Sequence, residues 1–350
     1  MPDRIEHKNT AQQQAIDIAA QRLIDGGLVA FPTETVYGLG ADAENPDAIA
    51  QIYAAKQRPT GHPLIVHLAP HADLAYWMGK VSPYARALAD AFWPGPLTLI
   101  VPRAAHIPAA VSGGQPTIGL RCPSHPVAQA LLTRFAALKQ GGQGGLAAPS
   151  ANKFGQVSPT RAEHVRTEFP ELDTSELLIL DGGPSAVGIE STIVDISDLD
   201  KGSGVPVLLR PGHILPEQIA RVLGVMPGHA HAGSPQVSGA LKAHYAPRTP
   251  LQLVRSLDLP GVIDALIRRP GTRVGALVFR LPTDSEAMGG AVDYYMCEHD
   301  PQAFAREIYG HLRNLDQQGY SALLIEQPPE TPAWRAINDR LSRAAAAFQS

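Results

Sequence analysis

Side chains that can bind an anion crowd one short stretch of this chain, between positions 28 and 67. The stretch supplies two hydroxyls, two cations and two imidazoles: Thr33, Thr35, Lys56, Arg58, His62 and His67. Cations offset negative charge and hydroxyls donate hydrogen bonds, so the combination suits a phosphate or a carboxylate. The pattern predicts an anion site beside a small polar pocket.

Each of these residues also has a simpler interpretation. The helix dipole favours cations in the last turn of a helix, so Lys56 and Arg58 could stand there for that reason alone. A single histidine such as His67 can be a hydrogen-bonded core residue, and Thr33 and Thr35 could bond to their own backbone. The combination, and no single residue, favours a binding site.

The surrounding pattern predicts the elements that position these side chains. Residues 28–31 form an apolar run that ends at a proline, as in a buried strand. Asn45 and Pro46 are typical of a helix N-cap and first helical position, and we expect that helix to end near Arg58. A second apolar run at 64–68 then completes one βαβ unit with polar residues at its strand ends.

Four motifs follow one another along the chain. They are Pro32-Thr-Glu-Thr-Val-Tyr-Gly-Leu-Gly40, Lys56-Gln-Arg58-Pro59, Ala148-Pro-Ser150-Ala-Asn152 and Ser238-Gly-Ala-Leu-Lys-Ala-His-Tyr-Ala-Pro247. The first three resemble the motifs of the YrdC family, specifically its threonylcarbamoyl-AMP synthases, and the similarity runs to about residue 212. The fourth resembles the linker between the domains of the two-domain members.

The resemblance implies a reaction. Enzymes of this kind condense L-threonine, bicarbonate or CO2, and ATP into threonylcarbamoyl-AMP and release pyrophosphate, so we expect a nucleotidyltransferase. The product feeds the threonylcarbamoyladenosine (t6A) modification of tRNA, with downstream tRNA-modification proteins as partners. Mg2+ is expected with ATP, because a divalent ion offsets the charge of the leaving phosphates. The sequence does not identify its ligands, for which Glu34, Glu190 and Asp195 are candidates.

The resemblance also assigns residues, position by position. The residues implied on the threonine side are Thr35, His67, Arg121, Ala148 through its backbone, and Ser191. The residues implied on the ATP side are Arg58, His62, Thr117, Ser150, Ser158, Arg210 and Tyr245. Lys56 and Arg58 are the predicted catalytic cations, with Lys56 near the phosphates, and Asn152 is expected to shape the loop around the pocket.

Two of these positions carry a further expectation. His62 stands where the family usually has asparagine, and an imidazole can donate to a phosphate but cannot supply both functions of an amide. Tyr245 lies in the linker motif, and a mobile segment there could close over the nucleotide as a lid that excludes water.

The residue types match what the implied reaction demands. The threonine carboxylate, the carbamate and the triphosphate are all anions, so the site needs cations and hydroxyls and no covalent nucleophile. Arg121 is expected to hold the carboxylate, since a guanidinium can clamp it with two hydrogen bonds. Thr117 and Arg121 stand four residues apart in a predicted strand, which places both on one face, as a single ligand spanning them requires.

Composition narrows the class of protein. A chain of 350 residues with 44% hydrophobic residues is long enough for two packed domains. The net charge of −4 gives no general attraction for nucleic acid, so an RNA contact would be weak and local. Cys122 and Cys297 are too few and too far apart for a disulfide framework or a zinc cage. No apolar run reaches the roughly 20 residues of a membrane span, so we expect a soluble protein of the cytoplasm.

The predicted architecture is α/β in two domains. The resemblance implies a YrdC-like catalytic domain over 1–224, with a twisted open mixed sheet and flanking helices. Residues 225–248 are rich in Gly, Pro, His and Ser and lack periodicity, which indicates a linker. Beyond residue 248 the patterns predict, in order, a strand at 251–254, a helix at 262–268, strands at 273–279 and 292–296, a helix at 301–317, a strand at 322–325 and a helix from 333. This order indicates a smaller, Rossmann-like α/β domain over 249–350.

Two further patterns concern local structure. Thr160 and Glu163 have the spacing of a capping box, which predicts a helix start after position 158. The run from Gly142 to Ala147 superficially fits a dinucleotide-binding fingerprint. It follows a predicted helix and precedes a predicted strand, the reverse of the order that such a site needs, so we discount it.

Other functions remain open. A carbamoyltransferase of hydrogenase maturation uses a similar domain, but those proteins carry cysteine-rich zinc motifs that two cysteines cannot provide. An isolated YrdC-like domain could be a non-catalytic RNA-binding module, which the negative net charge disfavours. A two-domain α/β protein could also bind another nucleotide. A P-loop NTPase, a zincin and a typical serine hydrolase are poorly supported, because their motifs do not occur in the sequence.

Overall fold

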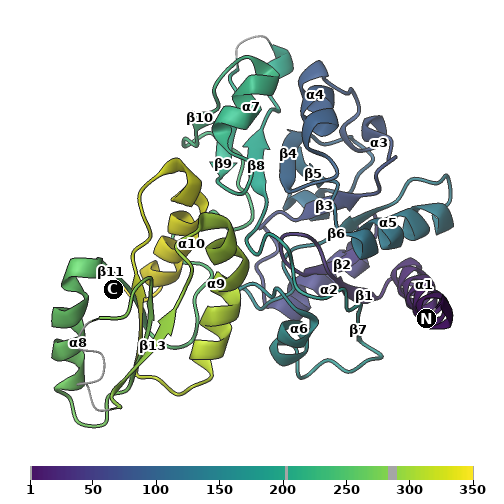
Figure 1. Ribbon diagram of the computed structural model, residues 1–350. Coiled ribbons are helices and arrows are strands. Elements are labelled where there is room, and N and C mark those ends of the chain that lie inside the picture. Colours follow the sequence, from purple (N-terminus) through teal and green to yellow (C-terminus); the bar gives the residue numbers. More distant parts are fainter. Residues whose placement is uncertain (1, 202–203, 283–289, 350) are drawn as a thin grey trace. The chain divides into compact units, whose positions relative to one another are not determined.

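The computed structural model describes residues 2–201, 204–282 and 290–349, which form two compact units (Figure 1). The first unit comprises Met1–Phe154, Pro159–Ala186 and Glu190–Ala240. The second unit comprises Gly155–Ser158, Val187–Ile189 and Leu241–Ser350. The segment predicted as a linker, 225–248, is therefore divided between the two units at Ala240.

A mixed sheet forms the centre of the first unit. Within the described residues it has ten strands, in the order β10-β9-β8-β4-β5-β3-β6-β2-β1-β7. The strands are β1 (Leu28–Phe31), β2 (Gly38–Asp42), β3 (Ile65–Leu68), β4 (Leu97–Pro102), β5 (Thr117–Arg121), β6 (Gly145–Ala147), β7 (Leu177–Ile179), β8 (Thr192–Asp195), β9 (Val207–Arg210) and β10 (Gly228–His229). Some neighbours are parallel, as β3 and β5 are, and others antiparallel, as β4 and β5 are. The predicted fold class is confirmed.

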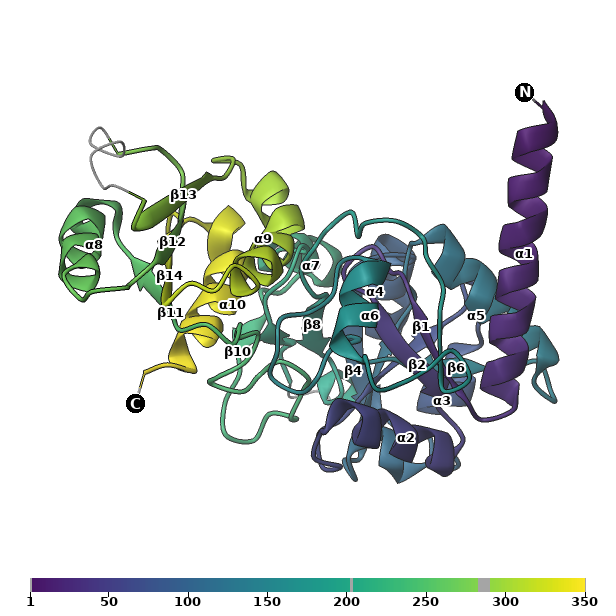
Figure 2. The ribbon, with the colours of Figure 1, turned by 90° about the horizontal axis from the view of Figure 1, so that it is seen from below.

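Helices cover much of this sheet. They are α1 (Pro2–Ile24), α2 (Pro46–Lys56), α3 (Leu74–Met78), α4 (Pro83–Phe92), α5 (Pro126–Leu138), α6 (Ala162–Glu168) and α7 (Pro216–Leu223), with 3-10 turns at Ala109–Ser112 and Leu199–Lys201. α1 packs beside α5 (Figure 2). Leu23 and Phe135 of these helices are buried in one apolar cluster with Phe31 and Leu146 of the sheet. These two helices therefore cover the end of the sheet that contains β1 and β6.

The predicted βαβ unit is wrong in its first strand. The strand that precedes α2 is β2, which pairs antiparallel with β1. β6 lies between β2 and β3 and is antiparallel to both, so β2 and β3 run in the same direction on either side of it. The glycines of β2 hid it from a propensity-based prediction. Gly40 is required there, because a Cβ atom would lie 2.8 Å from Cε1 of Phe31.

The caps of α2 place the cations that follow it. Asn45 caps the helix as predicted, since its Oδ1 accepts hydrogen bonds from the N–H groups of Asp47 at 3.0 Å and Ala48 at 3.2 Å. The helix ends at Lys56, and Gln57 adopts a left-handed conformation with φ of 51°. The chain turns sharply at this point. Lys56, the last residue of the helix, is buried, and Arg58 begins the next loop.

The predicted capping box is wrong. α6 begins at Ala162 with Arg161 as its N-cap, and within the described residues no side chain caps this end. The N–H of Thr160 instead donates to Nδ1 of His164 at 3.2 Å. The helix starts one residue later than a Thr160 cap requires, so Glu163 cannot reach back to complete the box.

A strip of the sheet is covered by extended chain. Ile100 of β4, Ile193 of β8 and Leu209 of β9 form a small apolar cluster with Val237. Val237 comes from the segment that approaches the end of the first unit, at 236–238. In the order of strands, β4, β8 and β9 lie on the opposite side of β3 from β1 and β2.

The second unit is a smaller α/β fold. Its described strands pair in parallel in the order β11-β14-β12-β13. They are β11 (Leu251–Val254), β12 (Val274–Val278), β13 (Val292–Met296) and β14 (Ala322–Glu326). The helices are α8 (Leu259–Ile267), α9 (Pro301–Asp316) and α10 (Arg335–Ala346), with 3-10 turns at Ser256–Asp258 and Pro332–Trp334. The expected order of strands and helices is confirmed here.

Over the whole described chain, we find no helix that combines the length and apolar character of a membrane span.

Candidate functional site

Predicted site residues converge on one face of the mixed sheet. His67 on β3 and Arg121 on β5 are direct neighbours in register, so their side chains point to the same face. Thr117 shares that face, because it stands four residues before Arg121 and side chains alternate along a strand.

Arg121 is a buried cation with spare hydrogen-bonding capacity. Its Nη2 pairs with Oε1 of Glu34 at 2.6 Å, and the other oxygen of Glu34 accepts the N–H of Ser124 at 3.1 Å. Among the described residues, no atom accepts a hydrogen bond from the buried Nε of Arg121. An unsatisfied buried donor is costly, so this geometry suits an anionic ligand that would accept the bond.

His67 is held as a neutral hydrogen-bond acceptor. Its Nδ1 lies 3.3 Å from the carbonyl oxygen of Ile65, which can only accept, so Nδ1 carries the hydrogen and Nε2 the lone pair. Burial, and then the charge of Arg121, lowers the pKa of His67 to about 3. The imidazole is therefore uncharged at neutral pH, and Nε2 can accept from an amine or a hydroxyl.

The two threonines of the first motif form a local network. Thr33 Oγ1 donates to the carbonyl of Val36 at 2.6 Å and accepts from the N–H of Thr35 at 3.2 Å. The simpler interpretation is thus right for Thr33. Its hydroxyl hydrogen is used there, so the 2.9 Å contact between the two hydroxyls is donated by Thr35. Thr35 keeps its lone pairs for a ligand.

A second buried guanidinium, that of Arg210, lies at the end of β9. Its Nε donates to the carbonyl of Ser191 at 3.0 Å and its Nη2 to the hydroxyl of Ser191 at 3.0 Å. The same hydroxyl is 2.8 Å from that of Thr98 on β4, the strand beside β5. Arg210 and Ser191, predicted for different substrates, are therefore in direct contact.

Arg58 joins this network through Ser238. Its guanidinium lies 3.4 Å from the hydroxyl of Ser238, whose carbonyl accepts from Nη1 of Arg210 at 2.9 Å. It also donates to the carbonyl of Pro63 at 2.9 Å and lies 5.6 Å from the ring centre of Phe154. Residues 180 positions apart in the sequence thus meet in one cluster of cations and hydroxyls.

His62 lies against the same phenylalanine. The two ring centres, of His62 and Phe154, are 5.1 Å apart in an edge arrangement. Partial burial, and then the charge of Arg58, lowers the pKa of His62 below its usual value. The imidazole is therefore neutral at neutral pH and can donate only one hydrogen bond.

Lys56 contacts main chain. Its Nζ donates to the carbonyl of Ser150 at 2.6 Å and to the carbonyl of Asn152. It is only 1% exposed, and burial, followed by the charge of Arg58, holds its pKa well below the usual value. Ala148, just before this loop, donates its N–H to the carbonyl of Ile65 at 3.0 Å, which fixes the loop to β3.

Segment 236–238 lies over the sheet face close to Arg58 and Arg210, which both bond to Ser238. Gln236 and Gln115 exchange two hydrogen bonds, of 2.9 and 3.1 Å, and Val237 rests on the apolar strip. Gly119 faces this segment, and together they line a small hollow that also includes Thr117.

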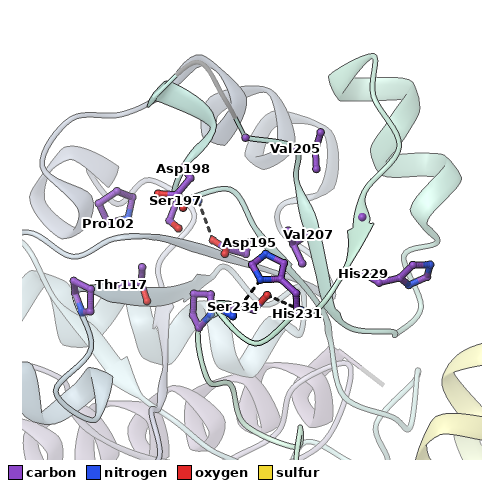
Figure 3. A pocket seen from close by; sticks show the side chains of 15 residues that line it. Pro102, Thr117, Asp195, Ser197, Asp198, Val205, Val207, His229, His231 and Ser234 are labelled. Carbon is purple, nitrogen blue, oxygen red and sulfur yellow. Dashed lines mark hydrogen bonds between the residues drawn. The ribbon is translucent and has the colours of Figure 1, made fainter.

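A larger cavity of about 490 Å³ opens on the other side of Thr117 (Figure 3). Asp195, Ser197 and His231 surround it, and one oxygen of Asp195 accepts the N–H of Ser197 at 2.9 Å. Its lining residues, all described, include no lysine or arginine. The cations of the candidate site lie outside this cavity.

Two family profiles divide the chain between them. Residues 21–212 match the Sua5, YciO and YrdC profile, described as telomere recombination. The chain belongs to the Sua5, YciO and YrdC family. Residues 214–346 match a second profile, described as the C-terminal domain of threonylcarbamoyl-AMP synthase. The resemblance to the YrdC family and its two-domain members is confirmed.

Relatives in this family span nearly the whole chain. A threonylcarbamoyl-AMP synthase of Bacillus subtilis is 40% identical over 340 residues, 93% of this chain and 92% of the relative. One of Pyrococcus abyssi is 33% identical, covering 97% and 96% of the two chains. A crystal structure of P. abyssi Sua5 complexed with L-threonine is 32% identical, with a TM-score of 0.80 and coverage of 96% and 95%.

Two predicted ATP-side residues of this Sua5-type chain, Ser158 and Tyr245, belong to the second unit. The carbonyl of Ser158 accepts from Nε of Arg313 at 3.4 Å. The ring of Tyr245 stacks on that of Tyr309 at 5.9 Å, and the guanidinium of Arg340 lies 5.3 Å from it. The other predicted site residues belong to the first unit, and their roles in binding stay predictions.

Two of the three predicted metal candidates, Glu34 and Asp195, already accept hydrogen bonds from other residues. Glu34 pairs with Arg121, and Asp195 accepts the N–H of Ser197. In the part of the chain that is described, no group of three or more His, Cys, Asp or Glu could hold a metal ion. Mg2+ often keeps water and nucleotide oxygens as ligands, so the residues fit an ion that arrives with ATP better than a resident one.

Sequence reasoning missed four residues of the cluster: Glu34 as the partner of Arg121, Thr98, Phe154 and Ser238. Ser238 opens the quoted linker motif, so that motif could have drawn attention to it. Thr98 could have been found only from the order of strands, because β4 and β8 are far apart in the sequence.

Proposed function

We propose that this protein is a threonylcarbamoyl-AMP synthase, which condenses L-threonine, bicarbonate or CO2, and ATP and releases pyrophosphate. The observation that carries this proposal is the convergence of three buried guanidiniums, of Arg58, Arg121 and Arg210, on one sheet face. Guanidiniums bind carboxylates and phosphates through charge-assisted hydrogen bonds, so three of them in one place suit a ligand with several negative groups.

The threonine side would lie between β3 and β5. Arg121 would bind the α-carboxylate through Nε, for which the described part of the chain offers no acceptor, while Glu34 accepts from Nη2 of the same guanidinium. His67 Nε2 and the hydroxyl of Thr35 would accept from the amine or the side-chain hydroxyl of threonine. These acceptors favour a substrate that carries donors at both positions.

The ATP side would lie between Arg58 and Arg210. Both guanidiniums bond to Ser238, and Arg210 also holds Ser191, at the boundary with the threonine side. Two cations there would offset repulsion as the carbamate approaches the α-phosphorus. Thr117, His62, Ser150 and Ser158 are proposed as further contacts of the nucleotide.

The reaction needs alignment more than a protein nucleophile. The unprotonated threonine amine adds to CO2 and loses a proton, or reacts with bicarbonate and releases water. An oxygen of the resulting carbamate attacks the α-phosphorus, and the bond from that phosphorus to the β-phosphate oxygen breaks as pyrophosphate departs. Mg2+, bound with ATP, would offset the charge on the departing phosphates. We propose that Tyr245 helps to keep water from the product, which hydrolyses easily.

The setting of this activity is also proposed from the resemblance. Threonylcarbamoyl-AMP would pass to downstream tRNA-modification proteins for t6A synthesis in the cytoplasm. Contact with RNA would be weak, because the chain carries a net charge of −4.

The test is direct detection of the product. Purified protein given ATP, threonine, bicarbonate and Mg2+ is expected to form threonylcarbamoyl-AMP, identified by mass spectrometry, with threonine-dependent release of pyrophosphate. Absence of the product, together with binding of tRNA that weakens steeply with salt, would favour the alternative of a non-catalytic RNA-binding module.

The proposed lid has its own test. Replacing Tyr245 with alanine is expected to weaken ATP binding or to raise the ATP consumed per product formed, because water would reach the adenylate. ATP binding is read from KM for ATP, and the ATP consumed per product from an assay that follows pyrophosphate and threonylcarbamoyl-AMP together. Unchanged values of both would remove the lid from the proposal.

A further inference from the structure

The loop at 150–154 follows β6 and is fixed on two sides. The N–H of Ala151 donates to the carbonyl of Tyr37 at 2.8 Å on one side. On the other side, the N–H of Phe154 donates to the carbonyl of Lys56 at 2.8 Å, and Nζ of Lys153 donates to the carbonyl of Ala55 at 3.2 Å. The loop is therefore attached to the C-terminal end of α2.

The side chain of Lys56 supports this loop from within. Its Nζ donates to the carbonyl of Ser150 at 2.6 Å and to that of Asn152. The carbonyl of Ser150 also accepts the N–H of Asn152 at 3.0 Å, so the loop makes a tight turn around the ammonium group. Lys56 thus adds one donor to each of these two carbonyls and ties the turn together.

The loop in turn positions three groups on the proposed ATP side. It carries Ser150 itself. It also carries Phe154, whose ring lies 5.6 Å from the guanidinium of Arg58 and 5.1 Å from the ring of His62. A shift of this loop would therefore move Ser150 and release Arg58 and His62 from Phe154 at the same time.

We propose that Lys56 is a positioning residue that acts on ATP through the loop at 150–154 and does not touch the phosphates. This inference rests on the proposed function. To reach a phosphate, the ammonium would have to break its hydrogen bonds to two main-chain carbonyls, and each loss would cost about as much free energy as one hydrogen bond to the phosphate contributes. The 1% exposure of Lys56 agrees with a group enclosed by main chain.

The test is a double-mutant cycle between Lys56→Met and Ser150→Ala, read from kcat/KM for ATP in pyrophosphate release. Each single change is expected to lower kcat/KM about 10- to 100-fold, the loss of one hydrogen bond to a charged group. Because Lys56 acts through the loop, the double variant should fall no more than about 3-fold below Lys56→Met alone. Losses that multiply would overturn the proposal.

A second readout separates positioning from simple loss of folded protein. Misplacing the loop should raise KM for ATP and leave KM for threonine unchanged, whereas partial unfolding lowers kcat alone. Phe154→Leu, which keeps Lys56, should raise KM for ATP in the same way. A fall in kcat with unchanged KM in both variants would contradict the positioning role. If Lys56→Met does not fold, as judged by circular dichroism, Lys56→Arg replaces it in the cycle.

A matched control is Lys139→Met. Lys139 is partly buried and pairs with Asp42 at 2.8 Å and Glu44 at 3.5 Å, away from the loop at 150–154, so kinetics should be unchanged. The wild type separates the two proposals. If it forms no threonylcarbamoyl-AMP the proposed function fails, and if it is active and the cycle is additive only the inference about Lys56 fails.

Discussion

At the residue scale, the site is defined by where hydrogen-bonding capacity is used and where it remains. Glu34 occupies one end of the Arg121 guanidinium and leaves Nε without an acceptor among the described residues. Ile65 fixes the hydrogen of His67 on Nδ1 and leaves Nε2 as an acceptor. A donor and an acceptor held side by side in this way match the carboxylate and amine of an amino acid.

Arg121→Lys should impair threonine binding specifically. An ammonium group is a point charge and cannot reproduce the two-point hydrogen bonding of a guanidinium, so we expect KM for threonine to rise about 10- to 100-fold. KM for ATP should change little. The measurement is pyrophosphate release with threonine varied. Arg134→Lys, in an exposed pair with Asp17, is the control, and equal effects of both changes would contradict the assignment.

His67 predicts a pH dependence of stability. Its pKa is about 3 when folded and about 6.5 when unfolded, so the unfolded chain binds the proton more tightly. Stability from this group is therefore complete above pH 6.5 and is lost as pH falls toward 3. Between pH 7 and pH 5 the loss should be about 2 kcal/mol.

Urea denaturation of the wild type and of His67→Gln at both pH values checks this. The variant cannot take up that proton, so its free energy of unfolding should fall by about 2 kcal/mol less than that of the wild type. Equal falls would show that His67 is accessible to protons in the folded state.

At the element scale, short strands and their connections place the site. β2 and β6 are neighbours beside β3, so the loops at 33–37 and 150–154 lie close to each other. The N–H of Leu39, in β2, donates to the carbonyl of Pro149 at 2.8 Å. Gly40 allows this packing, because Phe31 occupies the space of a side chain there. The site thus depends on close approach of backbone in β2.

Two glycine substitutions, one in β2 and one in an open position of α9, test whether β2 depends on this close packing. Gly40→Ala would place a Cβ 2.8 Å from Phe31 Cε1 and 3.2 Å from the carbonyl of Val29, and should lower the free energy of unfolding by about 1–3 kcal/mol. Gly310 lies within α9, where an added Cβ would meet no heavy atom within 4 Å beyond its chain neighbours and the helix's own backbone. Gly310→Ala should therefore raise the free energy of unfolding by about 1 kcal/mol through helix propensity. Thermal and urea denaturation measure both. A neutral Gly40→Ala would contradict the close packing.

At the scale of the whole molecule, the local charge of the site differs from the net charge of the chain. The chain carries a net charge of −4, yet the first unit buries three guanidiniums in one place. Long-range attraction depends on the total charge, whereas binding depends on the local cluster. The molecule should therefore attract a small anionic ligand without attracting polyanions in general.

This distinction predicts weak binding of tRNA. At 0.15 M salt we expect at most a shallow dependence of log K on log[salt], with a slope smaller in magnitude than about 3, because few phosphates would be neutralised. Filter binding across a salt series measures the slope. A steep slope with tight binding would instead support a dedicated RNA-binding surface.

Local patterns in the sequence determined much of this protein. The N-cap at Asn45, the strand from Thr117 to Arg121 and the order of elements after 249 could be predicted, because each depends on residues close together in the chain. The family could be recognised from motifs for the same reason. The capping box at Thr160 failed because one residue of offset in a helix start undoes it.

Only the tertiary structure decided which strands are neighbours and which side chains meet. The insertion of β6 between β2 and β3, the contact of Ser238 with both Arg58 and Arg210, and the carbonyl partners of Lys56 all join distant segments. Such contacts depend on sheet order and on how loops close, which leave no periodic mark in the sequence. The residue types indicated an anion site, and the tertiary structure determined which hydrogen bonds form there.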